Sequence, residues 1–359
     1  MATWYCDFSA GSNGAGTSSG SPFNNVASLV SAAPAAGDIV YCKGPLAGVL
    51  ALSTLAGTSL AYPIVFIGVS NLGTLDQSSR TVINASGNSG ALTGSGNYLL
   101  FYNFDFRNST STTHQHTGAN LTFINCDFVK GTGSAAAAFN GYDQYMDGCR
   151  FYNYTGTALT VAGVSGSRVQ KCYFEGCGAG VVSTGYRTLN MLDNVFNTIT
   201  NDAISVPANG NIGSAFQISN NTFYSIGGSG IVIDGTSNGE IHCHYNIFSV
   251  VTGTGIKITN TPSSTTVSAF KNYFHSCGLN FTNTVKNLGF NTNLGASHDF
   301  STASKPLLAM ALEFSGFSFV PHVQWISQQG TMPSFGAGIR KALSDQWQID
   351  ASASRQGGQ

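Results

Sequence analysis

The chain has 359 residues, of which only 9% are charged, against about 25% in an ordinary soluble domain. Glycine contributes 44 residues and the formal net charge is -1. This polar, nearly uncharged composition predicts no nucleic-acid partner, because nucleic-acid binding needs a basic face. A low charge also suits burial against protein neighbours, where charged groups are depleted.

The N-terminus lacks the basic stretch and apolar core of a secretory signal, and no run of about 18 apolar residues occurs. We therefore expect no secretory signal, no membrane partner and synthesis in a reducing cytoplasm. In that compartment the eight cysteines are expected to be small apolar core residues. Neither a CxxC nor an HxxxH spacing is present, so no metal site is predicted.

Residues 1–45 are predicted to form an N-terminal cap. A strand, TWYCDF, leads into a Gly/Ser loop, and Ser21 and Pro22 would provide the N-cap and first residue of a short apolar helix, FNNVASLVSAA. The segment GDIVYCKG follows as the first strand of the main body. A small helix of this kind is expected to cover the open end of a sheet.

The centre of the chain is a repeat built on one phenylalanine. Apolar residues also recur five residues before it, and the pattern resumes in a new phase at the phenylalanine itself, so the chain must bend between the two. Self-similarity at this period is typical of a solenoid. The phenylalanine recurs at steps of 22 to 27 residues, at Phe106, Phe128, Phe151, Phe174, Phe196, Phe223, Phe248 and Phe274.

Two further columns complete the repeat. After the phenylalanine and a Gly-rich break, a second apolar alternation aligns Leu159, Ile204, Ile231 and Ile256. Two residues before the phenylalanine, a third column is expected to satisfy buried turn backbone, with its asparagines passing amide hydrogen bonds from coil to coil. That column contains Cys126, Cys149, Cys172, Asn194, Asn221, Asn246 and Asn272. The columns predict two or three short strands per coil of a parallel β-helix.

Over residues 38–290 this repeat resembles the right-handed parallel β-helix, or pectate-lyase-like, superfamily. The resemblance implies an all-β solenoid but not an activity, because the scaffold carries lyases, hydrolases, isomerases, tailspikes and structural proteins. The N-terminal order of strand, Gly-x-Gly-Thr loop, Ser-Pro-Phe, helix and Gly-Asp-x-Val-Tyr resembles the front end of many bacterial and phage β-helix proteins. The predicted divisions are an N-terminal cap (1–45), a parallel β-helix (46–290) and a C-terminal cap and assembly arm (291–359).

The predicted arm, residues 291–359, departs from the repeat. It contains the apolar runs PLLAMALEF and FSFVPHVQWI, which no coil accounts for, and a polar tail too poor in apolar residues to fold alone. We expect these residues either to cap the solenoid or to cover a neighbouring subunit, which favours an assembly.

The best catalytic constellation is an outward column just before the repeat phenylalanine, formed by Asp105, Asp127 and Arg150. The two carboxylates could hold Ca²⁺ or share a proton as an acid/base pair, and Arg150 could bind a uronate carboxylate. The resemblance to polysaccharide lyases implies this chemistry, and calcium is expected only in that case. The alternative is a surface charge ladder in which Arg150 neutralises Asp127.

Other candidates are weaker. Asp202, in the segment TNDAI, resembles one coil of polygalacturonase-type hydrolases, but the accompanying carboxylates and Gly-His-Gly segment are missing, so a turn role is expected. His242 and His244 alternate outward on one strand, within reach of a shared metal or as a base, although an exposed polar face is the simpler interpretation. His114 and His116 lie in a Ser/Thr-rich loop. Outward tyrosines could stack on a glycan or form a subunit contact: Tyr152, Tyr173, Tyr224 and Tyr273.

The leading hypothesis is a structural, oligomeric β-helix protein of a phage particle, made in the host cytoplasm and assembled into the virion. It would be a capsid decoration or tail-associated protein, homotrimeric, with the major capsid or tail proteins as partners and no cofactor. The first alternative is a tailspike-type polysaccharide lyase or depolymerase that uses Asp105, Asp127 and Arg150. The second is a non-catalytic glycan-binding module that uses the outer tyrosines.

Overall fold

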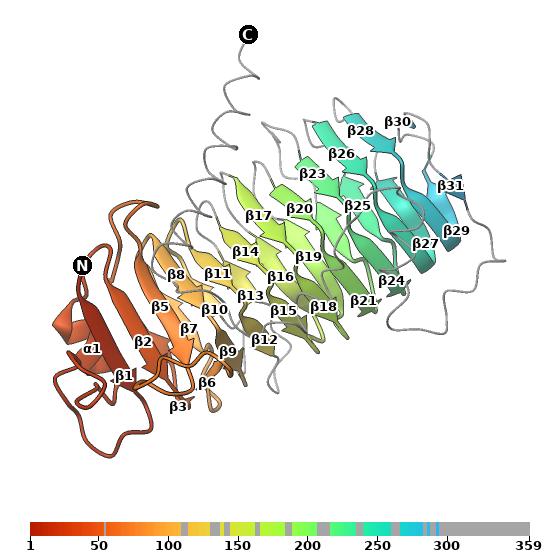
Figure 1. The fold of residues 1–359 in the computed structure, drawn as a ribbon. Helices are drawn as coiled ribbons and strands as arrows, with labels where there is room; N and C mark the ends of the chain where they lie inside the picture. The colour runs from red at the N-terminus through yellow and green to blue at the C-terminus, as the bar shows by residue number, and fades with distance from the viewer. Residues whose placement is uncertain are drawn as a thin grey trace, which may run out of the picture.

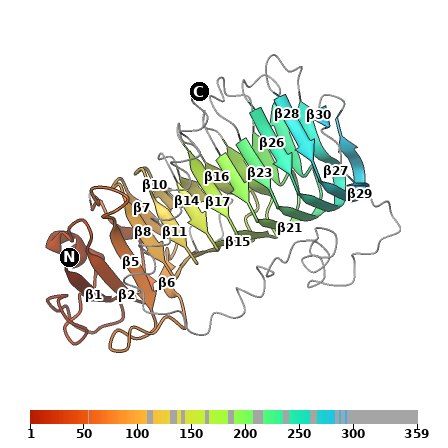
Figure 2. The same ribbon diagram turned by 45° about the horizontal axis from the view of Figure 1, so that its top comes forward.

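The computed structural model shows a parallel β-helix that, within the part of the chain it describes, carries one short helix at its N-terminal end (Figures 1 and 2). The predicted all-β solenoid is therefore confirmed, together with its small N-terminal helix. None of the helices among the described residues is long and apolar enough to cross a membrane. The described residues are 1–53, 55–108, 114–129, 137–139, 144–161, 166–183, 189–206, 216–234, 240–259, 266–282, 286–287 and 292–293. The predicted C-terminal arm, apart from its first few residues, lies outside them.

Each coil contributes one strand to a twelve-stranded parallel sheet, sheet A, which runs the length of the solenoid. Its strands are β1 (Thr3–Asp7), β2 (Ile39–Lys43), β5 (Ile64–Val69), β8 (Leu99–Tyr102), β11 (Thr122–Ile124), β14 (Tyr145–Asp147), β17 (Ser167–Gln170), β20 (Leu189–Leu192), β23 (Phe216–Ser219), β26 (Glu240–His244), β28 (Thr266–Phe270) and β30 (Lys286–Asn287).

The remaining strands form two further parallel rows, which join through the long strands β27 (Ile247–Thr259) and β29 (Tyr273–Phe281) into one nineteen-stranded sheet. The phenylalanine row contains β3 (Leu46–Ala47), β6 (Thr81–Asn84), β9 (Phe104–Arg107), β12 (Asp127–Val129), β15 (Arg150–Tyr152), β18 (Tyr173–Glu175), β21 (Val195–Ile199), β24 (Thr222–Ile226) and β31 (Thr292–Asn293). The third row contains β4 (Leu50–Ala51), β7 (Leu92–Gly94), β10 (His114–His116), β13 (Ala137–Phe139), β16 (Thr157–Val161), β19 (Ala179–Ser183), β22 (Ile204–Val206) and β25 (Ile231–Asp234).

The predicted bend between sheet A and the phenylalanine row is made by one residue with left-handed backbone. It stands three residues before the repeat phenylalanine in every coil from Phe106 to Phe274. A left-handed residue turns the chain from one sheet into the next without a long loop, and it resets the alternation of side chains. The residues at this position are Asn103, Asn125, Gly148, Lys171, Asp193, Asn220, Tyr245 and Lys271, with φ between 50° and 64°.

The predicted asparagine ladder follows directly after this bend, and it is confirmed. Asn194, Asn221, Asn246 and Asn272 are fully buried. The Asn194 side-chain amide donates to Asn221 Oδ1 at 2.9 Å, Asn221 donates to Asn246 Oδ1 at 3.1 Å, and Asn246 donates to Asn272 Oδ1 at 3.0 Å. Each amide also donates to a backbone carbonyl of the preceding coil, such as Met191 for Asn221 (2.9 Å). The ladder therefore satisfies turn backbone that water cannot reach.

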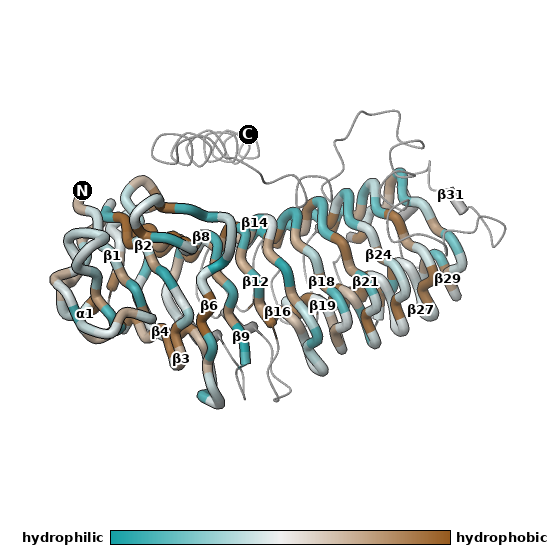
Figure 3. Tube along the Cα trace, turned by 60° about the horizontal axis from the view of Figure 1, so that its bottom comes forward, coloured by the Kyte–Doolittle hydropathy of each residue, from teal (hydrophilic) through white to brown (hydrophobic). Residues whose placement is uncertain are grey.

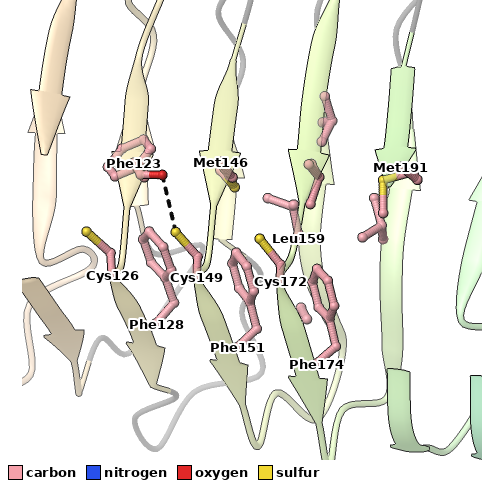
Figure 4. Close-up of a cluster of buried hydrophobic side chains, with 14 of the residues drawn as sticks. Phe123, Cys126, Phe128, Met146, Cys149, Phe151, Leu159, Cys172, Phe174 and Met191 are labelled. Carbon is pink, nitrogen blue, oxygen red and sulfur yellow. Dashed lines mark hydrogen bonds between the residues drawn. The ribbon is translucent and has the colours of Figure 1, made fainter. Parts of the chain in front are cut away.

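In earlier coils cysteine thiols occupy the same position. Cys126, Cys149 and Cys172 form a row beside the phenylalanines Phe128, Phe151 and Phe174 (Figure 4). Cys149 donates to the Phe123 carbonyl of the preceding coil at 3.4 Å, as the asparagine amides donate to preceding-coil carbonyls later in the chain. Adjacent phenylalanine rings from Phe106 to Phe274 stack with centroids 4.7 to 5.4 Å apart. Hydrophilic and hydrophobic segments alternate along the coils (Figure 3). The apolar side chains of the repeat are buried in one core cluster.

All eight cysteines are free thiols, and seven of them are buried. Burial, with a smaller effect from Asp7, raises the pKa of Cys6 to about 12. Burial also raises the pKa of the partly exposed Cys277 to about 11, although backbone hydrogen bonds oppose it. Thiols with such pKa values carry almost no thiolate at neutral pH, so they act as core residues, as the sequence predicts.

The N-terminal end of sheet A is closed by the cap. Residues 14–23 run along the open edge of β1, where Tyr5 donates to the Gly16 carbonyl (2.8 Å) and Phe23 donates to the Tyr5 carbonyl (2.9 Å). The helix α1 (Val26–Ala32) buries Leu29 in the core. The prediction of Ser21 and Pro22 as its start was wrong: Asn25 is the N-cap, and its side chain accepts from the Ser28 amide at 2.8 Å. Ser21 instead belongs to the edge-covering loop.

The asparagine ladder provides a test of what holds the coils together. The change Asn221→Ala removes the side-chain donor to the buried Met191 carbonyl and the acceptor of the buried Asn194 backbone N–H, so it should lower the free energy of unfolding by about 3 kcal/mol. Urea unfolding followed by circular dichroism would measure this loss. As a control, Asn197→Ala, on the outer face, should cost about 1 kcal/mol or less. Equal losses for both variants would show that the ladder is not the stabilising element proposed here.

Candidate functional site

The structure places the predicted catalytic residues side by side on the outside of the phenylalanine row. Asp105 on β9 is in register with Asp127 on β12, which is in register with Arg150 on β15. Arg150 is in turn in register with Tyr173 on β18. Four consecutive coils therefore present two carboxylates, a guanidinium group and a phenol along one line parallel to the solenoid axis.

Both carboxylates are held by arginines. Arg107, on the same strand as Asp105, contacts both oxygens of that carboxylate through Nε (3.0 Å) and Nη2. Arg150 contacts both oxygens of Asp127 through Nε (2.7 Å to Oδ1) and Nη2. A third guanidinium group approaches from the chain before β6, with Arg80 Nε lying 3.5 Å from Asp127 Oδ1. Each aspartate is only 6% exposed.

This arrangement decides what the column can do. Three guanidinium groups and two carboxylates leave the cluster with a formal charge of +1, which opposes cation binding. Both oxygens of each aspartate already accept charge-assisted hydrogen bonds, so Ca²⁺ or a substrate proton would have to displace an arginine. The Nε edge of Arg150 faces Asp127 and is not presented to a uronate. Burial acts to lower the pKa of Arg150, but hydrogen bonding and the charge of Asp127 outweigh it and raise that pKa.

Of the four predicted binding tyrosines, the structure brings two together. The rings of Tyr152 and Tyr173 meet edge to face with centroids 6.2 Å apart, and Arg150 Cζ lies 5.4 Å from the Tyr152 ring centroid. The Tyr173 hydroxyl accepts from Asn197 Nδ2 at 3.0 Å. Burial raises the pKa of Tyr152 to about 12, with Arg150 opposing the shift, so its hydroxyl stays protonated and can donate.

The other two tyrosines lie further along the same face. Tyr224 is in register with Asn197 and Ser249, and Tyr273 is in register with Ile247 and Thr292. Tyr224 is separated from Tyr152 by the coils of Glu175 and Asn197, and Tyr273 is separated from Tyr173 by three coils. They therefore belong to the same two columns but not to the same contact.

The remaining sequence candidates separate from this cluster. Asp202 accepts from the Ser229 amide at 2.7 Å, which gives it the expected turn role. His114 and His116 lie on β10, and their side chains are outside the described residues. His242 and His244 lie on β26 in sheet A. Among the residues that the structure describes, no three His, Cys, Asp or Glu side chains gather as a metal site would require.

Sequence reasoning missed two features. The first is the contact of Arg107 with Asp105 and of Arg80 with Asp127. Arg107 could have been found, because it stands two residues after Asp105 on one strand and therefore shares its face. Arg80 could not, because its contact with Asn125 (Nε to the carbonyl, 3.0 Å) joins residues 45 positions apart. The second feature is an apolar cluster on the outside of sheet A, in which Tyr102 is only 4% exposed.

The fold is a right-handed parallel β-helix of the pectate-lyase-like kind. Residues 67–214 match the family model described as "Right handed beta helix region", so that stretch carries the family's repeat. No curated protein matches the sequence.

Three solved structures show the same fold. A pectate lyase, Pel9A, has a TM-score of 0.52 at 14% identity, covering 93% of this chain and 88% of its own. An alginate lyase from Paenibacillus sp. str. FPU-7 has a TM-score of 0.51 at 14% identity. The alignment covers 73% of this chain and 97% of the alginate lyase chain. A GH136 lacto-N-biosidase from Eubacterium ramulus has a TM-score of 0.51 at 10% identity. The alignment covers 82% of this chain and 67% of the lacto-N-biosidase chain. At these identities the similarity establishes the fold alone.

Calcium binding separates the ion-pair interpretation of Asp127 from the lyase interpretation. A genuine site, with Ca²⁺ at about 100 times its dissociation constant, would add about 2.7 kcal/mol to the free energy of unfolding. We expect millimolar CaCl₂ to leave the urea midpoint of the wild-type chain unchanged.

Removing the carboxylate provides the matched variants. Asp127→Asn should cost about 2 kcal/mol with or without calcium, because it leaves Arg150 and Arg80 partly buried without their counter-charge. Asp105→Asn should cost less, since the Arg107 side chain is 39% exposed against 25% for Arg150. A calcium-dependent stabilisation that Asp127→Asn abolishes would contradict this interpretation.

Proposed function

We propose that this chain is a structural β-helix protein of a phage particle, either a capsid decoration or a tail-associated protein. It would be made in the host cytoplasm and would act by docking its outer surface onto neighbouring subunits, including copies of itself in a homotrimer. The observation that carries the proposal is a cluster of apolar and aromatic side chains on the outside of sheet A at the N-terminal coils, half of which are partly exposed.

This surface, the N-terminal apolar patch, has a buried base and a half-buried rim. The base consists of Ile67, Val69, Leu72, Leu100 and Tyr102, each no more than 5% exposed. The rim consists of Tyr5, Ile39, Tyr41, Val65 and Ile124, which pack against that base and remain partly open to solvent.

Two of the five rim residues are tyrosines. The rings of Tyr5 and Tyr41 stack with centroids 5.9 Å apart. A contiguous apolar surface with tyrosines at its rim is typical of protein contacts, where aromatic side chains provide most of the binding energy.

The outer face of the third row supports the same function. It presents a strip of small and β-branched side chains, one from each coil in register, all partly exposed. Only one member carries a charge. A regular, nearly uncharged strip can lie flat against another protein without desolvating ionic groups. Its members are Thr160, Val182, Ser205, Val232 and Lys257.

Incorporation into particles tests the proposal. Quantitative mass spectrometry of purified particles, with the major capsid protein as reference, should find this protein in many copies for a decoration role or in a handful for a tail role. The double change Tyr41→Ser with Val65→Ser should reduce incorporation severalfold, because it removes apolar area from the patch.

The matched control is Val195→Ser with Tyr224→Ser, which removes similar, partly exposed side chains from the outer face of the phenylalanine row and should leave incorporation unchanged. Thermal unfolding of both variants would confirm that they fold. Absence of the wild-type protein from particles would refute the virion proposal, and full incorporation of the Tyr41/Val65 variant would refute docking through the patch.

A second candidate function, non-catalytic glycan binding, is favoured by the contact of Tyr152 with Tyr173 beside Arg150. Aromatic faces and hydrogen-bonding groups on one exposed line are suited to sugar rings. The lyase alternative has less support, because Asp105 and Asp127 would first have to leave their arginines.

Affinity electrophoresis in gels that contain acidic or neutral polysaccharides would test glycan binding. If the candidate is right, a polysaccharide retards the wild-type chain, Tyr152→Ala weakens the retardation about tenfold or more, and Tyr273→Ala leaves it unchanged, since Tyr273 lies outside the contact. If no polysaccharide retards the wild-type chain, or Tyr152→Ala is retarded equally, the glycan-binding candidate fails.

A further inference from the structure

A turn of the chain packs on the base of the N-terminal apolar patch. Four members of the base belong to sheet A and point outward, because their neighbours on each strand are buried in the core. These four are Ile67 and Val69 on β5 and Leu100 and Tyr102 on β8. The fifth member, Leu72, comes instead from the turn that follows β5, residues 70–79, which we call the cover turn.

Leu72 is the residue through which the cover turn reaches the patch. It is 5% exposed and packs in one cluster with the four outward side chains, each of which is at most 4% exposed. The residues on either side of it, Asn71 and Gly73, are exposed, as are most others of the turn. The base of the patch is therefore closed in part by a segment of the chain's own surface.

The tip of the cover turn makes its hydrogen bonds internally. The Ser70 N–H donates to the Asp76 carbonyl (2.7 Å), and the Asp76 N–H donates to the Asn71 carbonyl (3.2 Å). In the described structure the turn is joined to the next coil near its end, where Asn103 Nδ2 donates to two of its carbonyls at 3.3 and 2.9 Å. The contact of the tip with sheet A is apolar, so moving the tip outward breaks no hydrogen bond to that sheet.

We propose that the cover turn is an autoinhibitory contact, which closes the base of the patch in the free chain and swings away when a neighbouring subunit docks. An apolar side chain of that subunit takes the place of Leu72. The exchange replaces one apolar contact by another, so the partner has only to bury more apolar area than Leu72 does. This proposal rests on docking through the patch and adds the regulation of that contact.

Such a cover solves a problem of the free chain. An open apolar patch on a sheet promotes association with wrong partners. With the cover turn closed, only the rim stays partly open, including the stacked rings of Tyr5 and Tyr41. The equilibrium between closed and open turn also reduces the apparent affinity of docking, since only the open state is fully competent. Loss of the Leu72 contact should therefore strengthen docking.

Hydroxyl-radical footprinting of the full-length chain, free and in purified particles, tests the exchange. We expect the Leu72 side chain to be oxidised severalfold faster in particles than in the free chain, whereas Tyr41 becomes protected there. If Tyr41 is protected and Leu72 is labelled no faster, the cover turn does not move and the proposal is overturned, although docking through the patch stands. If Tyr41 is not protected, docking through the patch fails and the cover proposal fails with it.

A variant of the turn tests the closed state directly. Leu72→Ser removes the apolar contact that holds the cover turn down, so in the free chain it should raise the fluorescence of anilinonaphthalene sulfonate, a dye that binds exposed apolar surface, severalfold. It should also raise incorporation into particles. The matched control is Leu75→Ser, which removes the other leucine of the same turn, outside the apolar cluster, and should change neither quantity.

Thermal unfolding would establish that both variants fold. Unchanged dye fluorescence in a folded Leu72→Ser variant, or incorporation below that of the wild-type chain, overturns the proposal. If Leu72→Ser does not fold, the footprint of the wild-type chain decides alone.

Discussion

The structure depends on how each coil turns from sheet A into the phenylalanine row. At that corner the chain bends through a single left-handed residue, and the next side chain must satisfy backbone groups inside the solenoid. Asparagine does this in four coils by bonding a carbonyl of the preceding coil, and in three of them it also bonds the next asparagine. Cysteine does it less completely in earlier coils. Since an unsatisfied buried carbonyl is costly, this corner fixes the register of the coils, and the phenylalanine stack depends on that register.

Once the interior is packed and the buried backbone groups at the bends are hydrogen-bonded, the outward side chains are not needed to keep the coils in register. They have nevertheless become grouped by kind along the solenoid. Apolar and aromatic residues lie outside the first coils of sheet A, the arginine–aspartate cluster lies on the phenylalanine row, and the histidine pair lies outside β26. Parallel in-register stacking produces such grouping, because equivalent positions of successive coils become neighbours about 4.8 Å apart.

The sequence was informative where a residue repeats a role. Columns of Phe, Asn and Cys have a physical signature at a fixed period, so the bore, the asparagine ladder and the bend could be predicted. Contacts that occur once could not. Arg80 reaches Asp127 from a different coil, Asn25 rather than Ser21 starts the helix, and Lys171 and Tyr245 adopt left-handed backbone without any intrinsic preference for it. The register of Asp105, Asp127 and Arg150 follows from the repeat, whereas the engagement of both carboxylates by arginines depends on side-chain geometry.

Similarity of fold to polysaccharide lyases and a glycosidase does not settle function, because the bore that produces the similarity is remote from any outer-face chemistry. A catalytic carboxylate must offer an oxygen to a proton or a metal. In this chain the carboxylate oxygens of the two aspartates in the best-placed column instead accept hydrogen bonds from arginines of the same cluster, so both carboxylates are paired. An outer face with paired charges and an apolar, tyrosine-rimmed patch at one end has the properties of a docking surface. For that reason the outer face, rather than the fold, carries the argument for a structural role.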